Sequence, residues 1–366
     1  MKFECTTEQL GMAVGTAVRF IERRVNLPVL SSVLITADKN GRVTLRATNL
    51  ECGVEVIVQA KVTTEGVVAV PGATLSGVLG NIRTKTVSLA LVGETLKIEA
   101  ERISASLKTL PHEDFPILPR VSASTSFTIK ASDLNRAIRN VVYCASTSAI
   151  KPELQSVVVY AEMGKLTTAA TDSFRLAEKI VPLHGGGSVP QLLLPIKNAA
   201  ELMRLLEGVN EEVEIYYNEH QISTHIKDIY YTSRLIDGTF PNYRQIVPKS
   251  FTTEAIILRE DLSQALKSLS VFADKFAQVS FSIDPTKKAI ILSSRNPDVG
   301  EEVSTIRSTI SGDAVSMNFN GKYLSDSLQS ISGESVRIHS NGPGKALLIR
   351  DAADDTFYYL AMPMNR

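Results

Sequence analysis

The sequence predicts an α+β protein built from three copies of one unit, each with two helices on antiparallel sheet. Two observations lead to this prediction: amphipathic helical stripes recur along the chain, and runs of β-branched and apolar residues lie between them. The chain has 366 residues, of which 44% are hydrophobic and 21% charged, a balance typical of globular proteins. This length suits two or three domains, and the repeats favour three.

The first helix of each copy has apolar residues at offsets 0, 3, 4 and 7, which fall on one face of a helix. In the first copy these residues are Leu10, Ala13, Val14 and Ala17. The same stripe begins again 124 residues later at Leu134 and a further 128 residues on at Leu262. One such stripe is common in any core helix, whereas three in register indicate a repeat.

A second helix is predicted in each copy, with stripes that begin at Leu75, Ala199 and Leu324. The second stripe follows the first by 65, 65 and 62 residues in the three copies. Pro71 and Pro195 lie at the start of the second helix in copies one and two, where proline is tolerated. Six stripes in two registers therefore support a threefold repeat.

Strands are predicted between the helices, because these segments are rich in Val, Ile, Leu and Thr, and Asn40-Gly41 is a hairpin signal. The segments that follow the first helices are 29–37, 42–49 and 53–62; 155–161, 165–171 and 176–183; and 279–284, 289–294 and 303–310. More strands follow the second helices, at 86–92, 95–101 and 103–110, and at 213–217, 221–226 and 229–235.

Domain boundaries are expected near residues 122 and 248, which gives domains 1–122, 123–248 and 249–366. Phe115-Pro116 and Phe240-Pro241 close the first two copies. The linkers that follow contain Pro and Ser and are short, so the domains are expected to be packed against one another.

The charge balance excludes a protein with a wholly basic surface, because Lys plus Arg and Asp plus Glu number 39 each. Any nucleic-acid contact must therefore come from a local group of basic residues. Cys5, Cys52 and Cys144 are far apart and lack metal-ligand spacing, so neither a disulfide framework nor a metal site is expected. The N-terminus has no signal-peptide pattern, and no apolar run is long enough to span a membrane. We expect a cytoplasmic protein without a cofactor.

Two other classes of protein are considered. A hydrolase or other enzyme is disfavoured because no HxxxH, HExxH, GxSxG or Walker pattern occurs, and Gly185-Gly186-Gly187 lies between strands rather than before a helix. A β-rich scaffold or adhesin is disfavoured by the missing signal peptide and by the basic residues on the helices. The five histidines are His112, His184, His220, His225 and His339.

Several segments, in order, resemble the bacterial DNA polymerase III beta subunit, the processivity clamp. They are NLPVLSSVLI (26–35), TLPHEDFP (109–116), AATDSFRLA (169–177), LIDGTFPNYRQIVP (235–248) and YYLAMPM (358–364). The resemblance covers the whole chain. It implies a non-catalytic clamp whose two protomers join head to tail into a closed ring of six domains, with the helices lining a hole for duplex DNA. The implied partners are double-stranded DNA of any sequence, a second copy of the chain, the polymerase III alpha subunit, the clamp loader and other proteins with clamp-binding motifs.

A sliding ring needs diffuse phosphate contacts rather than contacts to bases. Basic residues on or beside the predicted helices suit this role, although such residues are also common on ordinary solvated surfaces. The resemblance adds Arg23 and Arg24 before Leu27, the loop 148–152 and Lys197. In the loop, Pro152 and Glu153 depart from the family pattern. The candidate DNA-binding residues are Arg23, Arg24, Arg83, Arg136, Arg139, Lys151, Lys197, Arg204, Lys267 and Lys322.

The resemblance also implies a pocket that binds short client peptides ending in apolar residues. Apolar walls of Leu, Ile, Val and adaptable Met, with Arg175 and Thr171 as polar anchors, suit such a ligand. Ser173, Phe174, Gln245, Gly344 and Ala346 depart from the best-known member, so the preferred peptide is expected to differ. The candidate pocket residues are Leu154, Thr171, Ser173, Phe174, Arg175, Leu176, Pro241, Ile246, Val247, Met362, Pro363 and Met364.

A head-to-tail interface is the last implication of the resemblance. It places Leu107 of one protomer against Val271 and Phe272 of the next, and Arg102 opposite Glu301 and Glu302. Apolar contacts are expected to dominate this interface, because exposed ion pairs contribute only about 0–1 kcal/mol.

Overall fold

The structure is a computed structural model that describes residues 1–22, 27–121, 125–185 and 187–364. Within these residues the chain forms two compact units. Unit 1 comprises residues 1–131 and 204–235, and unit 2 comprises residues 132–203 and 236–366.

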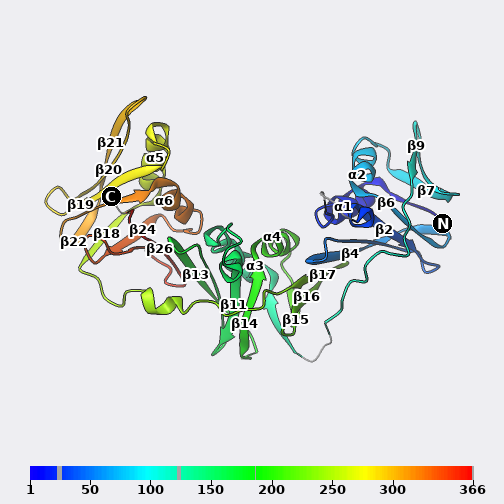
Figure 1. The fold of residues 1–366 in the computed structure, drawn as a ribbon, viewed down its shortest axis with the longest axis horizontal. Coiled ribbons are helices and arrows are strands. Elements are labelled where there is room, and N and C mark those ends of the chain that lie inside the picture. Colours follow the sequence, from blue (N-terminus) through cyan, green and yellow to red (C-terminus); the bar gives the residue numbers. More distant parts are fainter. Residues whose placement is uncertain (23–26, 122–124, 186, 365–366) are drawn as a thin grey trace. The chain divides into compact units, whose positions relative to one another are not determined.

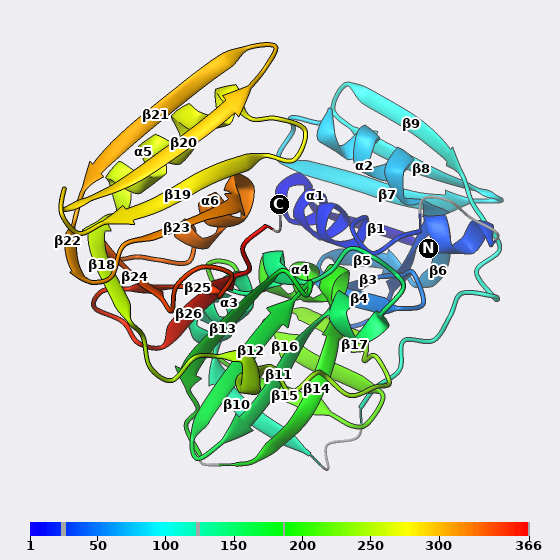
Figure 2. The same ribbon diagram turned by 60° about the vertical axis from the view of Figure 1, so that its left-hand side comes forward.

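All six predicted helices are present (Figures 1 and 2). They are α1 (Thr7–Ala17), α2 (Gly72–Gly80), α3 (Ala131–Arg139), α4 (Ile196–Leu205), α5 (Arg259–Leu269) and α6 (Gly321–Leu328). Their apolar stripes face the core: Leu10, Leu134 and Leu262 are all buried. The threefold helical repeat predicted from the stripes is therefore confirmed.

The described part of unit 1 holds two antiparallel sheets. The five-stranded sheet has the order β5 (Lys61–Thr64), β1 (Lys2–Thr6), β7 (Thr86–Val92), β8 (Thr95–Ala100) and β9 (Ile103–Lys108). The eight-stranded sheet has the order β10 (Ser126–Lys130), β15 (Glu212–Tyr217), β16 (Gln221–Ile226), β17 (Ile229–Arg234), β4 (Cys52–Gln59), β3 (Arg42–Thr48), β2 (Ser32–Ala37) and β6 (Gly66–Pro71). Strands of the first and second copies thus share one sheet.

The described part of unit 2 also holds two antiparallel sheets. The nine-stranded sheet has the order β14 (Val189–Pro195), β11 (Ser156–Glu162), β12 (Lys165–Thr171), β13 (Arg175–Pro182), β26 (Phe357–Ala361), β25 (Leu347–Asp351), β24 (Ser335–Ser340), β18 (Thr253–Leu258) and β22 (Thr309–Gly312). The four-stranded sheet has the order β21 (Gly300–Arg307), β20 (Ala289–Asn296), β19 (Gln278–Asp284) and β23 (Val315–Asn320).

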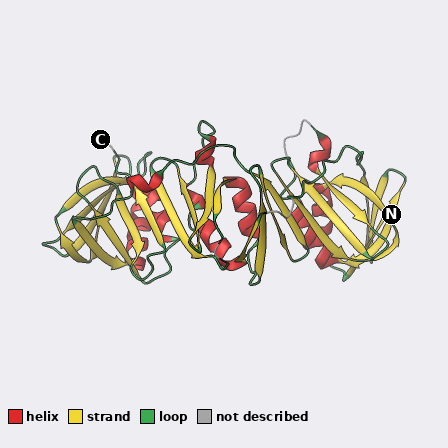
Figure 3. Cartoon of the chain, turned by 90° about the horizontal axis from the view of Figure 1, so that it is seen from below, coloured by secondary structure: helices red, strands yellow, loops and turns green. Residues whose placement is uncertain are grey.

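The helices pack in pairs against these sheets, as Figure 3 shows in red and yellow. In unit 1, α1 lies against α2 and against β3 and β4, while α2 contacts β2, β6 and β9. In unit 2, α5 lies against α6 and contacts β18, β20 and β21, while α6 contacts β23 and β26. Two helices on antiparallel sheet is the α+β architecture that the sequence predicts.

The structure corrects several predicted element ends. Val141, Ile82, Leu206 and Ile331 are the last members of their stripes, yet each lies beyond the end of its helix and is still buried. The chain leaves these helices through turns, so apolar spacing overestimates helix length. The start of the segment 29–37 is a 3₁₀ helix, η1 (Pro28–Ser31), because Pro28 favours a turn at that position. The predicted segment 303–310 is divided between β21 and β22.

Candidate binding pocket and basic surfaces

A cavity of about 560 Å³ with a mostly apolar lining lies within unit 2. Its walls come from the turn between β12 and β13, the segment around the 3₁₀ helix η4 (Tyr243–Ile246), the loop before β25 and the end of β26. The lining residues are Thr171, Ser173, Phe174, Arg175, Leu176, Ile246, Pro248, Asn341, Gly344, Lys345, Ala346, Leu360 and Met362.

Most of the candidate pocket residues meet at this cavity, but five do not line it. Leu154 is buried within the 3₁₀ helix η3 (Pro152–Gln155), and its backbone bonds to Lys151 and Ser146. Val247 packs against the core beneath the cavity. Met364 is turned to another strand, where its amide donates to the carbonyl of Asn318 at 2.7 Å. Pro241 and Pro363 are also absent from the lining.

The sequence analysis noted Gly344 and Ala346 as departures at the pocket. It did not place Pro248, Asn341, Lys345 or Leu360 there. Asn341-Gly342 and Gly344 are a turn signal that was available in the sequence. Gly342 and Gly344 have φ of 90° and 75°, which glycine adopts without strain. A turn signal indicates a loop, but it gives no information on which cavity the loop borders.

The turn from Thr171 to Arg175 forms one wall of the cavity through its own hydrogen bonds. The Thr171 hydroxyl donates to the carbonyl of Arg175 at 2.7 Å, and Asp172 Oδ1 accepts from the amides of Phe174 and Arg175 at 3.0 and 2.9 Å. Ser173 has φ of 78°, a left-handed conformation. The Phe174 ring is consequently 62% exposed, and the Phe174 carbonyl accepts from the Met362 amide at 2.8 Å. Local polar bonds thus present an apolar side chain to solvent.

Arg175 lies at the wall of the cavity, and three side chains hold it. Its Nε donates to Asp172 at 2.9 Å and its Nη1 to Asp326 at 2.7 Å. The guanidinium lies 4.3 Å above the ring of Tyr323. Burial opposes the charged form, but these carboxylates more than offset it and raise the pKa of Arg175 above its ordinary value. The side chain is therefore a fixed cation at the pocket wall.

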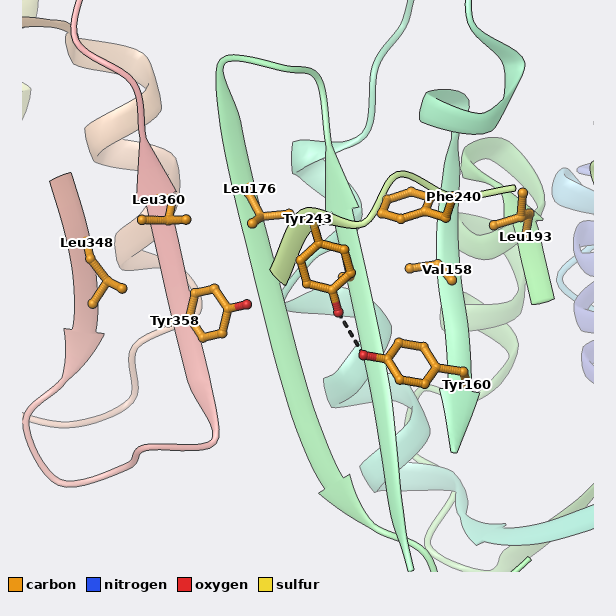
Figure 4. Close-up of a cluster of buried hydrophobic side chains, with 10 residues drawn as sticks. Val158, Tyr160, Leu176, Leu193, Phe240, Tyr243, Leu348, Tyr358 and Leu360 are labelled. Carbon is orange, nitrogen blue, oxygen red and sulfur yellow. Dashed lines mark hydrogen bonds between the residues drawn. The ribbon is translucent and has the colours of Figure 1, made fainter. Parts of the chain in front are cut away.

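A buried cluster beneath the pocket fixes the linker that carries η4 (Figure 4). Tyr160 on β11 and Tyr243 on the linker share a hydrogen bond of 2.9 Å between their hydroxyls. The Tyr243 hydroxyl also donates to Glu178 on β13 at 2.5 Å, and Arg244 Nε donates to the same carboxylate at 3.3 Å. Burial and the adjacent Glu178 charge raise the pKa of Tyr243. This cluster, together with Phe240, Leu176 and Leu360, positions Ile246 and Pro248 at the cavity.

The candidate DNA-binding residues are spread over the helices and their flanks. Arg136 and Arg139 lie on α3, Lys197 and Arg204 on α4, Lys267 on α5 and Lys322 on α6. All of these are exposed, as are Arg83 after α2 and Lys151 before η3. Arg136 is paired with Asp133 at 2.6 Å and Lys322 with Asp326 at 2.9 Å. Arg23 and Arg24 lie outside the described residues.

The candidate interface residues lie at two sheet edges. β9 is the edge strand of the five-stranded sheet and β21 is the edge strand of the four-stranded sheet. Val271 is 67% exposed and Phe272 half-buried in the 3₁₀ helix η5 (Ser270–Phe272), which contacts β21.

Leu107 on β9 is only 5% exposed, so it has little surface left to bury against a partner. Arg102 is exposed in the turn that precedes β9. Glu301 pairs with Arg295 at 3.9 Å, and Glu302 accepts from the Ser268 hydroxyl at 2.9 Å. These two carboxylates therefore already have partners within the chain.

Metal and redox chemistry have no evident centre in the part of the chain that the structure describes. No group of three or more His, Cys, Asp or Glu there could hold a metal ion. The three cysteines are buried and form no disulfide. Burial and the neighbouring Glu4 raise the pKa of the Cys5 thiol to about 11, and burial also raises that of Cys144, so neither is a reactive thiolate. None of the described helices combines the length and apolarity needed to cross a membrane.

Comparison with known proteins gives matches along the whole chain. Three domain models of the DNA polymerase III beta subunit match: the N-terminal domain at residues 1–119, the central domain at 128–242 and the C-terminal domain at 244–365. The beta sliding clamps of Bacillus subtilis and Caulobacter vibrioides are 26% and 28% identical, and each alignment covers 100% of both chains.

Solved structures give the same result. The Bacillus subtilis DNA polymerase sliding clamp has a TM-score of 0.94 at 25% identity, with 100% of this chain and 99% of that chain covered. The Pseudomonas aeruginosa DnaN sliding clamp bound to griselimycin has a TM-score of 0.94 at 26% identity, with 100% of both chains covered.

Proposed function

The chain belongs to the DNA polymerase III beta subunit family, the beta sliding clamps, and from this premise we propose how its residues divide the work of a clamp. A clamp of this family is a processivity factor without catalytic activity, and this chain is one. Residues are to be assigned to three tasks: closing a ring, binding DNA without contacts to its bases, and binding client proteins.

Ring closure is assigned to the two edge strands, β9 and β21. An exposed edge strand has unpaired amides and carbonyls that favour pairing with another strand. Antiparallel pairing of β9 in one protomer with β21 in the next would create a nine-stranded sheet, as long as the sheet that already runs from β14 to β22. The contact uses two different surfaces, so it is head to tail, and two copies close it into a ring.

The apolar residues at this proposed interface are Val271, Phe272 and Val303. Val303 lies on β21 and, like Val271, is well exposed in the isolated chain. On the other side of the interface, Leu107 stabilises β9 from the core of its own protomer. It does not form the contact, because its side chain is already buried. Arg102 adds a favourable charge opposite Glu301 and Glu302, and solvent screening keeps this contribution small.

DNA contact is assigned to the basic residues of the six helices. Exposed Arg and Lys side chains on helices reach phosphates but select no bases, which permits sliding. The candidates are those of the sequence analysis: Arg23, Arg24, Arg83, Arg136, Arg139, Lys151, Lys197, Arg204, Lys267 and Lys322. Because the chain has no net charge, we expect a clamp that is not closed around DNA to bind DNA weakly. Retention on DNA must then come from closure of the ring.

Client binding is assigned to the cavity of unit 2. Its apolar wall of Leu176, Ile246, Leu360 and Met362, next to the fixed cation of Arg175, suits a short peptide with an apolar end and a nearby carboxylate or carbonyl. Partners that carry such peptides are the polymerase III alpha subunit, the clamp loader and other clamp-binding proteins. The Pseudomonas aeruginosa clamp binds griselimycin, and we expect this chain to bind griselimycin in the same cavity.

The domain boundaries and the compartment are also proposals. We propose three clamp domains at 1–122, 123–248 and 249–366, supported by the repeat of helices and by the ranges of the three domain models. The sheets run continuously from one copy into the next. A division of the chain by compactness alone therefore assigns part of the second copy to the unit of the first copy and part to the unit of the third. Action in the cytoplasm is supported by the three buried cysteines, none of which forms a disulfide.

The observation that carries this proposal is the match of all three clamp domain models, in order, to a chain in which β9 and β21 are both edge strands. The test is retention on DNA after loading with a clamp loader and ATP. We expect the labelled protein to stay on a nicked circle and to be lost quickly when the circle is cut. Equal loss from circular and linear DNA would contradict topological linkage.

A further inference from the structure

Two cations in unit 2 share one carboxylate. Asp326 on α6 accepts from Arg175 Nη1 at 2.7 Å through Oδ2, and both of its oxygens accept from Lys322 Nζ at 2.9 Å. Arg175 is at the pocket wall, whereas Lys322 is 71% exposed one helical turn away on α6. A single side chain therefore connects the pocket to a helix of the basic surface.

Neighbouring residues fix the start of α6, the helix that carries Asp326. The Asn320 side chain accepts from the amides of Lys322 and Tyr323 and so fixes the start of α6. The Tyr323 ring stacks beneath the Arg175 guanidinium at 4.3 Å, and the Tyr359 hydroxyl of β26 donates to the Tyr323 carbonyl at 2.8 Å. Because the backbone is fixed, a change in the charge near Lys322 acts mainly on the Asp326 carboxylate.

We propose that Asp326 is a positioning residue that couples DNA occupancy of α6 to the affinity of the pocket for clients. When a DNA phosphate binds the Lys322 ammonium, Arg175 is the only cation that still pairs with Asp326. The guanidinium is then held more firmly between Asp172, Asp326 and Tyr323, and a pre-organised anchor binds peptide more tightly. This inference rests on the proposed function, because it needs both the DNA-facing role of α6 and the client role of the cavity.

The size of the coupling is limited by the pair that is lost. Lys322 is exposed, so its pair with Asp326 is screened and is worth at most about fivefold in an equilibrium constant. By linkage, a bound peptide must strengthen DNA binding by the same factor. Such coupling would favour clients on clamps that are already on DNA.

The first experiment measures peptide affinity by fluorescence anisotropy in the full-length protein. The probe is a fluorescein-labelled hexapeptide that ends in Leu-Phe with a free carboxylate, chosen to suit the apolar wall and Arg175. Lys322→Ala should tighten binding about twofold to fivefold, since it removes the competing cation. Asp326→Asn should weaken binding about tenfold, and Asp326→Glu should restore part of the loss.

A double variant separates coupling from simple structural damage. In the Asp326→Asn background, Lys322→Ala should have no further effect, because its route to Arg175 is gone. The matched control is Lys287→Ala, which removes another exposed Lys–Asp pair, with Asp284 at 3.5 Å, and should leave peptide affinity unchanged. Independent effects of the two changes in the double variant would overturn the proposal. Thermal unfolding of each variant checks that the fold is intact.

The second experiment adds DNA. Peptide affinity is measured with and without a saturating duplex, at one salt concentration, and the duplex should tighten wild-type binding but not Lys322→Ala. The same gain in both proteins, or no gain in the wild type, would overturn the coupling. If the wild type bound no peptide at all, the proposed client role of the cavity would fail instead, so the two failures are distinct.

Discussion

Lys179 and Asp354 join β13 to the turn before β26. Lys179 is 5% exposed, and its Nζ donates to Asp354 at 2.8 Å and to Thr356 at 2.5 Å. Burial opposes ionisation of Asp354, but the hydrogen bond from Lys179 prevails and lowers the pKa of Asp354 to about 2. A buried cation that loses its partner is costly, so this pair matters for stability.

Asp354→Asn should lower the free energy of unfolding at pH 7 by about 1–3 kcal/mol, towards the lower end because Asp354 is 38% exposed. Because the folded-state pKa is depressed, the contribution of Asp354 is full above its ordinary pKa near 4. It is lost as the pH falls towards 2. Urea unfolding at pH 7, 5, 4 and 3 measures this. A difference between variant and wild type that stayed constant down to pH 3 would contradict it.

Tyr243 gives a second prediction at the scale of single residues. Tyr243→Phe removes the hydroxyl that bonds to Glu178 and Tyr160, and it leaves both groups buried with one partner fewer. We expect a loss of about 1–3 kcal/mol in the free energy of unfolding. Weaker peptide binding should follow, since Tyr243 holds the linker that carries Ile246.

The matched control for Tyr243 is Tyr216→Phe. Tyr216 also donates to a glutamate, Glu214, at 2.5 Å, but this pair lies at the surface, where water replaces the lost bond. Urea unfolding should therefore show little change for Tyr216→Phe. Equal losses for the two variants would mean that burial of Glu178 contributes nothing.

Single residues were also where sequence reasoning succeeded and failed within the pocket. Residues of the turn 171–176 were predicted because they are adjacent in sequence, so one matched segment brings all of them. Lys345 and Leu360 were missed, and Leu154 was included although it is buried elsewhere. Which of several neighbouring side chains faces a cavity depends on strand register, which composition does not reveal.

At the scale of elements, the turn that shapes the pocket occurs twice. Thr48 bonds to the carbonyl of Cys52 at 2.9 Å, as Thr171 bonds to that of Arg175. Asn49 accepts from the amides of Glu51 and Cys52, as Asp172 does in the second copy. Leu50 and Ser173 share a left-handed backbone, with φ of 72° and 78°. The repeat found from helical stripes therefore extends to the details of this turn.

The first-copy turn borders its own cavity of about 310 Å³ in unit 1. Its chemistry differs, however, because Cys52 and Gly53 stand where the second copy has Arg175 and Leu176. A side chain on Gly53 would collide with Leu118, whose Cδ2 lies 2.3 Å from the position of such a Cβ. Leu118 thus fills the space, and the turn at this cavity has no equivalent of Arg175 or Leu176. The cation that lines this cavity, Arg234, comes from the end of β17 instead.

We therefore expect one peptide per chain rather than two. Isothermal titration calorimetry with the Leu-Phe hexapeptide should give a stoichiometry close to one. Phe174→Ala should weaken binding about tenfold, because it removes an apolar wall of the pocket. Ile117→Ala, at the first-copy cavity, should not change it. Two sites per chain, or a greater loss from Ile117→Ala, would contradict the assignment.

Helices and strands differed in how far the sequence could predict them. Each helix was found because a stripe with a period near 3.6 is a property of the segment itself. The short strands β5 and β22 were missed as separate elements, because four residues give too little alternation. The order of strands in the sheets was not predictable either, since β17 pairs with β4 and β26 with β13 across the copies.

At the scale of the whole molecule, these strand pairings between copies decide which parts of the chain form one compact unit. β4 and β17 pair along five residues of each strand, and so do β13 and β26. Sheets that continue across copies bind neighbouring domains through backbone hydrogen bonds, which do not depend on side chains. β9 and β21 are edge strands of the first and third copies, and we expect equivalent pairing of these two strands between protomers.

The ring interface gives the last prediction. Charging Val271 and Phe272 together, as Val271→Glu with Phe272→Glu, should convert a dimer into folded monomers. Each new carboxylate would have to lose its water when β9 of the partner approaches, and it would also stand close to Glu301 and Glu302. Within the monomer the cost should be small, because Val271 is exposed and Phe272 is only half-buried. Sedimentation velocity measures the mass, and circular dichroism checks the fold.

Met163→Glu is the matched control for this interface. Met163 is almost fully exposed in the turn between β11 and β12, away from both edge strands in sequence, so its charge should leave the dimer intact. The double variant should also fail to stay on circular DNA after loading, because a monomer cannot close a ring. An intact dimer in the double variant would show that β9 and β21 are not the edges that meet. The basic helices would then need another route to enclose DNA.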